Sequence, residues 1–460
     1  MLTYNVVAAG FVGVVLVLLT VPLARRAART DGDPVLARII LIGLILKFVA
    51  AVARYWVAQE LYDGSADAGV YLRFGEEYSE SMRQGNFTYD GSARGGSDGT
   101  HFIRQLTGWV MFITGPSRFA AFFVFSWFSF LGAYLFHRAF ALAVPGGNKR
   151  RYAYMLFFLP SLIYWPSSVG KEAWMLMTLG LSAYGIARLL THAPGGYTIA
   201  GLGLVGSAAV RPHMTVMVAG GLAIAVLLRR SKPGSLLGPV ARVVGVGLVF
   251  VALVFAVQAA EERFGVEGEG VRGAEQVIDA TAEQTSKGGS EFEARRPDSV
   301  TDVPFAVFTV LFRPLLFEAH NAQALLTSLE GMLLMLLIVL SWKRLRQVPR
   351  QMLRNPYVAF AATYSVGFML AFASFGNFGI LARQRSQLFP FLLVLLAIPA
   401  GRVINEVADR RSTRAAGRHD PVLVYLPAGP DPATEGQPGQ APTRAGQPPP
   451  PPPPDHVQGT

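Results

Sequence analysis

The feature that most constrains the fold is a series of long apolar segments, separated by short connections that hold most of the charged residues. A helix needs about 20 apolar residues to cross the hydrocarbon core of a bilayer. On this criterion we expect helices at 4–23, 35–58, 117–143, 152–165, 171–191, 197–210, 213–229, 239–259, 321–342, 356–376 and 386–404. The sequence therefore predicts an all-α polytopic integral membrane protein with about eleven transmembrane helices.

Composition supports this fold class and excludes several others. Of the 460 residues, 52% are hydrophobic and 15% are charged, which is too apolar for a soluble globule of this length. The formal net charge is +11, but Lys and Arg stand in short clusters between apolar segments, so we expect no nucleic-acid partner. The chain has no cysteine, which excludes disulfides, thiolate catalysis and cysteine-ligated metal sites.

The basic connections predict the orientation in the membrane. They lie at 25–38, 149–151, 229–232 and 343–354 and fall on one side when the expected spans are counted, so we assign that side to the cytoplasm. The first apolar segment lacks the basic start of a signal peptide, which predicts a retained helix with an external N-terminus. An odd number of spans then predicts a cytoplasmic C-terminus.

Two large loops are then expected on the outer side, at 60–104 and 261–304. Segments 101–115 and 303–320 are apolar on one side and precede a full span, which is typical of helices that lie in the outer interface. Each of them could instead be an extension of the span that follows. Neither alternative changes the predicted topology.

The chain divides into three parts. Residues 1–34 form an extra first helix with its basic loop, residues 35–404 form the membrane core, and residues 405–460 form a tail rich in Pro, Gly, Gln and Thr. A segment of this composition buries too little apolar surface to fold, so we expect a disordered cytoplasmic tail. Its proline run at 448–454 could also dock a partner as a polyproline II helix.

Charged residues on the predicted outer side indicate where chemistry could occur. The first outer loop contains the cluster Asp63-Gly-Ser-Ala-Asp67-Ala-Gly-Val-Tyr71, just past an apolar helix. The charged side chains assigned to this side are Asp63, Asp67, Glu76, Glu77, Lys171, Glu172, Arg211, Arg313, Glu318, Arg383 and Arg385. A carboxylate can act as a general base, and cations can hold a phosphate leaving group. Together they predict transfer of a group from a phosphorylated carrier.

One group of candidate phosphate ligands lies beside the short spans 152–165 and 197–210. Lys171-Glu172 and Arg211 occupy the turns that follow these spans, where the chain would sit below the outer surface in a protein-lined cavity. The alternative is that Lys171 and Arg211 are anchors at helix ends whose charged groups reach the interface.

A second group of candidate phosphate ligands consists of arginines near the later spans. Arg383 and Arg385 stand two residues apart in a segment with two glycines, which allow the backbone to approach a ligand closely. Arg313 interrupts the apolar segment 303–320 on the same predicted side. These guanidinium groups would suit a lipid-linked pyrophosphate, or they could pair with lipid headgroups.

No cofactor is indicated with certainty. Carboxylate oxygens in a loop suit Mg²⁺, Mn²⁺ or Ca²⁺, so a divalent cation at Asp63 and Asp67 is one option. The histidines lack the spacing of metal ligands, and no P-loop or dinucleotide fingerprint is present. We therefore expect no work driven by ATP.

The acidic loop resembles that of the C-type, polyprenyl-phosphate-dependent glycosyltransferases, polytopic membrane enzymes whose first large outer loop carries a catalytic acid. The loop in that family often reads Asp-Glu-x-x-Tyr, and Asp67-Ala-Gly-Val-Tyr71 is similar, with Ala68 in place of the second acid. The segment 159–172 is similar to the Pro/Trp/Ser and Lys-acid turn of envelope-polysaccharide membrane proteins. The helix at 4–23 is an addition to the usual order of that family.

This resemblance implies a multi-pass enzyme of the bacterial cytoplasmic membrane that acts in envelope polysaccharide synthesis. It implies that Asp67 or Asp63 deprotonates a hydroxyl of a glycan or lipid acceptor, which attacks the anomeric carbon of a sugar on polyprenyl phosphate. It further implies that the cations hold the departing phosphate, namely Lys171, Arg211, Arg383 and Arg385.

Three other functions remain open at this point. An O-antigen-type polysaccharide polymerase or ligase would rely on outward arginines and a second large outer loop. A transporter or flippase of lipid-linked sugars would carry charges inside its spans, of which Lys47 is the clearest. A scaffold would recruit partners through the tail at 405–460.

Overall fold

A computed structural model describes residues 2–61, 63–64, 66–88, 96–228, 247, 300–319, 321–373 and 375–400. All regular secondary structure in these ranges is helical, as predicted. The described residues belong to one compact unit. Apart from residue 247, the helix expected at 239–259 lies outside the described residues, as do residues 261–299 of the second outer loop and the tail at 405–460.

Six of the described helices are long and apolar enough to cross a membrane, as the predicted class of membrane protein requires. They are α1 (Leu2–Asp31), α2 (Val35–Trp56, continued by the π-helix η1, Val57–Leu61), α5 (Arg118–Ala143), α8 (Lys171–Leu190), α14 (Ala322–Leu340) and α18 (Phe378–Ala397). Shorter apolar helices are α10 (Pro212–Leu228), α13 (Val303–Phe312) and α17 (Pro356–Ala371). The short helix α9 (Gly196–Ala208) precedes α10. The count of eleven spans stays a prediction.

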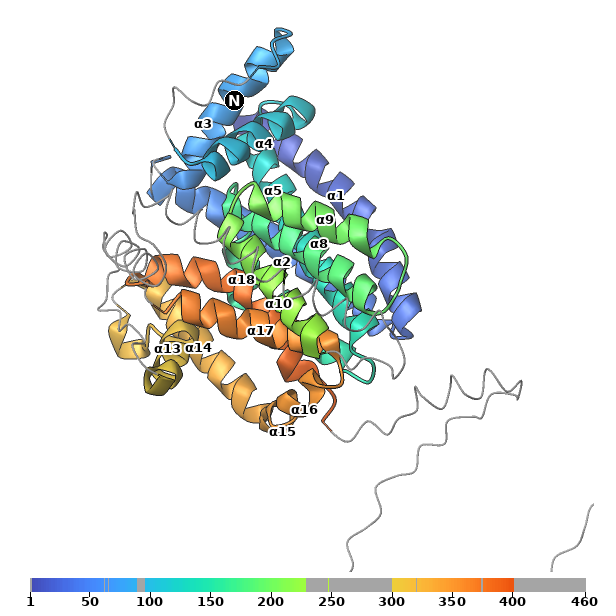
Figure 1. The fold of residues 1–460 in the computed structure, drawn as a ribbon. Coiled ribbons are helices and arrows are strands. Elements are labelled where there is room, and N and C mark those ends of the chain that lie inside the picture. The colour runs from blue at the N-terminus through green and yellow to red at the C-terminus, as the bar shows by residue number, and fades with distance from the viewer. Residues whose placement is uncertain are drawn as a thin grey trace, which may run out of the picture. The chain divides into compact units, whose positions relative to one another are not determined.

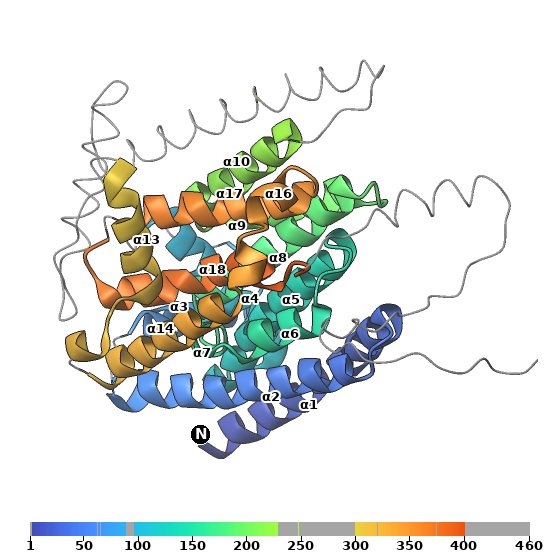
Figure 2. The ribbon, with the colours of Figure 1, turned by 90° about the horizontal axis from the view of Figure 1, so that it is seen from below.

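The central helix α5 packs against α1 and α2 on one side and against α8 on the other. Figure 2 shows α1 and α2 side by side along one edge of the bundle, with α10 and α17 along the opposite edge. The backbones of α5 and α8 touch where both helices carry glycine. A Cβ atom at Gly132 would lie 2.2 Å from the main-chain oxygen of Leu176, and one at Gly180 would lie 2.4 Å from that of Gly132. Such close approach is how helices associate in membranes.

The predicted basic connections meet at one end of this bundle. Asp31, the last residue of α1, accepts hydrogen bonds from Arg138 (3.0 Å) and Lys149 (2.9 Å). Arg151 donates to the Ser341 hydroxyl at 2.7 Å, which joins the start of α6 (Lys149–Phe158) to the end of α14. The connections at 25–38, 149–151 and 343–354 therefore share one end, as the charge pattern predicts, and the fourth connection, at 229–232, lies outside the described residues. The cellular side of that end stays a prediction.

The helical segment between α5 and α8 is interrupted rather than continuous. The sequence predicts one short helix at 152–165, but α6 ends at Phe158 and the five-residue helix α7 (Pro160–Tyr164) follows. Leu159 between them is extended, with ψ at 125°, because a residue that precedes proline disfavours the helical conformation. Residues 165–170 then form a buried non-helical turn that leads into α8. The prediction of a single helix here is wrong.

Two short helices, α3 (Asp67–Arg83) and α4 (Asp98–Thr114), pack against each other and cross the opposite end of the bundle (Figure 1). Gly115 ends α4 with φ at 85°, a conformation that L-residues rarely adopt, so α4 is separate from α5. Residues 101–115 are thus a helix of their own rather than an extension of the next span. The same holds for α13, which ends at Phe312 well before α14 begins.

Candidate functional site

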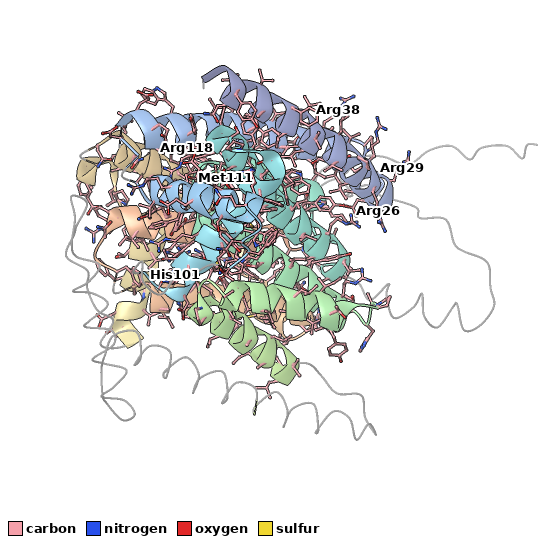
Figure 3. The ribbon with its side chains drawn as sticks, turned by 90° about the horizontal axis from the view of Figure 1, so that it is seen from above. Arg26, Arg29, Arg38, His101, Met111 and Arg118 are labelled. Carbon is pink, nitrogen blue, oxygen red and sulfur yellow. The ribbon has the colours of Figure 1, made fainter. Side chains whose placement is uncertain are left out.

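The candidate site lies at the end of the bundle that α3 and α4 cross. Figure 3 looks onto this end, with His101 and Met111 marking the course of α4. Arg118, the first residue of α5, anchors α3 there, because its Nε and Nη2 donate to the two carboxylate oxygens of Glu76 at 2.5 and 2.6 Å. A second anchor joins the two short helices, since Arg83 donates to the main-chain oxygen of Met111 at 2.7 Å. The first residues of α3 and α4 are therefore held over the ends of the spans.

At the centre of the site Glu172 and Arg211 form an ion pair. Glu172 stands in the first turn of α8, and Arg211 precedes α10 by one residue. Nη2 of Arg211 lies 2.9 Å from Oε1 of Glu172, and the two side chains are 10% and 17% exposed. Nη1 of Arg211 donates to Oε1 of Gln384 at 2.9 Å, and Gln387 donates to the same oxygen at 2.7 Å. The guanidinium group is thus fixed by α8 and α18 together.

A second ion pair joins the acidic loop to α18. Nη1 of Arg383 donates to Oδ2 of Asp67 at 3.2 Å, and the Asp67 side chain is 75% exposed. Arg383 also lies near enough to Glu172 to act on its charge. The two ion pairs therefore belong to one electrostatic unit, in which the exposed carboxylate of Asp67 is open to solvent and to a ligand.

Tyr71 completes the wall of the site beside these charges. A Cβ atom at Gly170 would lie 3.4 Å from Glu172 Oε2 and 3.8 Å from the ring of Tyr71, so the three residues are neighbours. Burial raises the pKa of the Tyr71 phenol, and the negative charges of Asp67 and Glu172 act in the same direction. The phenol stays protonated and is suited to donate a hydrogen bond to an anion.

Lys171 contributes a cation at the edge of the site. Its Nζ lies 3.3 Å from the hydroxyl of Ser97, the residue that precedes α4. The start of α4 is held close to Arg211, because a Cβ atom at Gly99 would lie 2.4 Å from the main-chain oxygen of Val210. Only glycine allows this approach. Lys171 and Arg211 thus reach the site from α8 and from the turn before α10.

Of the two predicted catalytic acids, the structure brings only Asp67 into contact with the cations. Asp63 is exposed in a turn after η1, with φ at 46°, and no described contact joins it to the ion pairs. The described residues include no group of three or more His, Asp or Glu side chains that could hold a metal ion. Asp67 is paired with Arg383 instead. The geometry gives no support to a divalent cation at Asp63 and Asp67.

Two of the predicted phosphate ligands lie elsewhere. Arg385 is 2% exposed, and its Nη2 donates to the main-chain oxygens of Thr309, at 3.4 Å, and of Arg313. Arg313 pairs with Glu318, whose Oε1 accepts from Nε at 2.9 Å. These contacts hold the end of α13 against α18. No contact described for the structure joins either arginine to the cluster around Glu172.

Two side chains of the site are not among the predicted site residues, Tyr71 and Gln384. Tyr71 ends the quoted motif of the acidic loop, and one helical turn separates it from Asp67 on α3, which is the spacing of neighbours on one face. Gln384 lies between the two predicted arginines. The four-residue spacing from Asp67 on a helix could therefore have identified Tyr71 from the sequence. The role of Gln384 depends on its contact with Arg211, which is 173 positions away.

Comparison with known proteins adds no relationship, since no family model, curated protein or solved structure matches this chain. The site must be interpreted from its own geometry. It contains two carboxylates, three cations and a protonated phenol from α3, α8, α18 and the turn before α10. This set can hold an anionic group and accept a proton next to it.

Proposed function

We propose that the protein is a membrane glycosyltransferase that moves a sugar from a polyprenyl-phosphate carrier to a glycan or lipid acceptor at the outer face of a bacterial cytoplasmic membrane. The observation that carries the proposal is the convergence of Asp67, Lys171, Glu172, Arg211 and Arg383 at one end of an apolar helical bundle. A carboxylate beside several cations is the combination that group transfer from a phosphate requires.

In the proposed step Asp67 is the general base. An acceptor hydroxyl attacks the anomeric carbon of the donor, the bond between that carbon and the phosphate oxygen breaks, and the hydroxyl proton moves to Asp67. The electron pair of the broken bond leaves with polyprenyl phosphate. The exposure of Asp67 allows an acceptor to reach it, and its pairing with Arg383 keeps the carboxylate next to the cation that would contact the phosphate.

Arg211, Lys171 and Arg383 are assigned to the phosphate of the donor. The partly buried pair of Arg211 with Glu172 keeps the guanidinium in one orientation before any ligand binds, which reduces the reorganisation needed during the reaction. Tyr71 is assigned a hydrogen bond to the same anion, because its phenol is buried and protonated. Confinement of donor and acceptor to one interface would supply a further part of the rate.

A transfer assay with the full chain in lipid vesicles tests the proposal. Vesicles would contain polyprenyl phosphates that carry different radiolabelled sugars, together with a mixed glycan and lipid acceptor fraction. We expect label to pass to an acceptor with release of polyprenyl phosphate, and we expect Arg211→Gln to abolish it. Activity that survives loss of Asp67 but depends on Arg383 would favour a polymerase or ligase instead.

One specific observation favours a transporter as a second candidate. Besides Lys47, the structure buries Glu330 and Arg385 within candidate spans, and charges in such positions often mark transport pathways. The same vesicles separate the two functions. Exchange of an intact lipid-linked sugar between the leaflets, without release of polyprenyl phosphate, would support transport.

A further inference from the structure

Two oppositely charged side chains are buried in candidate spans, away from the ion pairs of the site. Lys47 on α2 is 3% exposed and Glu330 on α14 is 5% exposed. Neither forms a salt bridge with any residue in the described ranges. Charges are costly inside a bilayer, so these two side chains need a specific partner.

Their partners are consecutive residues of the short helix α7. Nζ of Lys47 donates to the main-chain oxygen of Leu162 at 2.7 Å and to the hydroxyl of Ser129 at 2.9 Å. Oε1 of Glu330 accepts from the main-chain N–H of Ser161 at 2.7 Å, and its Oε2 accepts from the Ser161 hydroxyl. The Lys47 ammonium and the Glu330 carboxylate thus bind main-chain groups of α7 that have no partner within this short helix.

The turn after α7 is hydrogen-bonded to the helices around Lys47. The hydroxyl of Ser126 on α5 donates toward the main-chain oxygen of Lys47 and toward the hydroxyl of Ser167, each at 3.1 Å. Ser167 lies in the turn at 165–170, which ends directly at Lys171 and Glu172. Contacts from α2, α5 and α14 therefore converge on the segment that sets where α8 begins.

We propose that Lys47 and Glu330 are positioning residues that fix α7, and through the turn at 165–170 fix the place of Glu172 opposite Arg211. This assignment rests on the proposed function for its consequence in catalysis, but its structural part does not. Each charge holds one residue of α7, so loss of either charge releases α7 on one side. The beginning of α8 then moves relative to Arg211 and Gln384.

The local part of the proposal can be tested by fluorine NMR on the full chain in lipid nanodiscs. The chain has six tryptophans, of which Trp165 directly follows α7 and Trp342 lies at the opposite end of the bundle. Incorporation of 5-fluorotryptophan gives one resonance for each, and single Trp→Phe variants assign them. The test variants are Lys47→Met and Glu330→Gln. The conservative variants are Lys47→Arg and Glu330→Asp, and Ser365→Ala on α17 is a buried polar control.

We expect Lys47→Met and Glu330→Gln each to shift or broaden the Trp165 resonance while Trp342 stays unchanged, and the conservative variants to restore it at least in part. We expect sugar transfer to fall on the order of 100-fold in kcat, with a smaller change in KM, because a displacement of about 1 Å can have that effect. An unchanged Trp165 resonance in both variants, or equal shifts of Trp165 and Trp342, would overturn the proposal. The NMR measurement needs no turnover, so absence of transfer by the wild type would count against the proposed function alone.

Discussion

Arg383 donates a hydrogen bond to Asp67 across 3.2 Å, although the two residues are 316 positions apart in the chain. The contact joins the first turns of α18 to the start of α3. In the sequence the acidic loop and the arginine segment are independent candidates for chemistry. In the structure they form one unit, and Arg383 is also near enough to the pair of Glu172 with Arg211 to act on the Glu172 charge.

The two arginines of α18 should respond differently to substitution. We expect Arg383→Gln to weaken binding of polyprenyl phosphate in vesicles with little loss of thermal stability, because Arg383 is at the exposed edge of the site. We expect Arg385→Gln to lower the thermal midpoint instead, since its buried guanidinium binds the end of α13. Binding measured by isothermal titration and unfolding measured by intrinsic fluorescence would distinguish them. Equal loss of binding in both variants would contradict these assignments.

The pair of Glu172 with Arg211 should be energetically coupled. Removal of one partner of a buried ion pair leaves an uncompensated charge and typically costs about 3–5 kcal/mol. We expect Glu172→Gln and Arg211→Gln to be less destabilising together than the sum of the two single changes, with a coupling of about 1–3 kcal/mol. Denaturant unfolding in one detergent would measure all four proteins. Additive effects would show that the pair is not a unit.

The contact between α5 and α8 predicts a strong dependence on glycine. We expect Gly132→Ala to lower the thermal midpoint, because the added Cβ would meet the main-chain oxygen of Leu176. Gly220→Ala on α10 is the matched control, since nothing lies within 4 Å of its added Cβ. We expect that variant to be neutral or slightly stabilised, by up to about 1 kcal/mol. Similar midpoints for the two variants would argue against the packing of α5 on α8.

The predicted location of α4 in the membrane interface can be measured directly. At its far end the rings of Phe87, Trp109 and Phe112 contact one another, and Ile113 beside them is 78% exposed. Because the chain has no cysteine, a nitroxide can be attached at Ile113→Cys alone. We expect its spectrum to be relaxed more by oxygen than by a water-soluble nickel complex, because the apolar face of an interfacial helix reaches the boundary between headgroups and acyl chains.

The control for that measurement is a nitroxide at Gln84→Cys, an exposed polar position at the end of α3. It should be relaxed mainly by the nickel complex. A label at Ile113 with the same accessibility as the label at Gln84 would place α4 in water, against the prediction.

The sequence predicts much of the fold because apolar length and basic connections are local properties. Helices occur at ten of the eleven expected positions, and the eleventh, at 239–259, lies outside the described residues apart from residue 247. The break at Leu159 was signalled only by Pro160, and the expected continuous helix was wrong there. Length and composition cannot show that a helix is held in two pieces by side chains from other spans.

The site was predicted in part, and the difference between Arg383 and Arg385 explains why. Treated as a loop before a span, both arginines were expected to reach the same ligand. The structure places them on α18. Residues two positions apart are separated by about 200° around the helix axis, so the two side chains lie on nearly opposite faces. Lys47 and Glu330 could not be matched to partners in advance, because each binds α7 from more than 100 positions away.

The central claim is that Asp67 removes the acceptor proton during transfer of a sugar from polyprenyl phosphate. Its most direct test is the rate of polyprenyl phosphate release by the full chain in vesicles, compared among the wild type, Asp67→Asn and Asp63→Asn. We predict that Asp67→Asn lowers the rate by about 10²–10⁴-fold, the usual contribution of a general base, while Asp63→Asn stays close to the wild type. Release by Asp67→Asn at the wild-type rate would contradict the account.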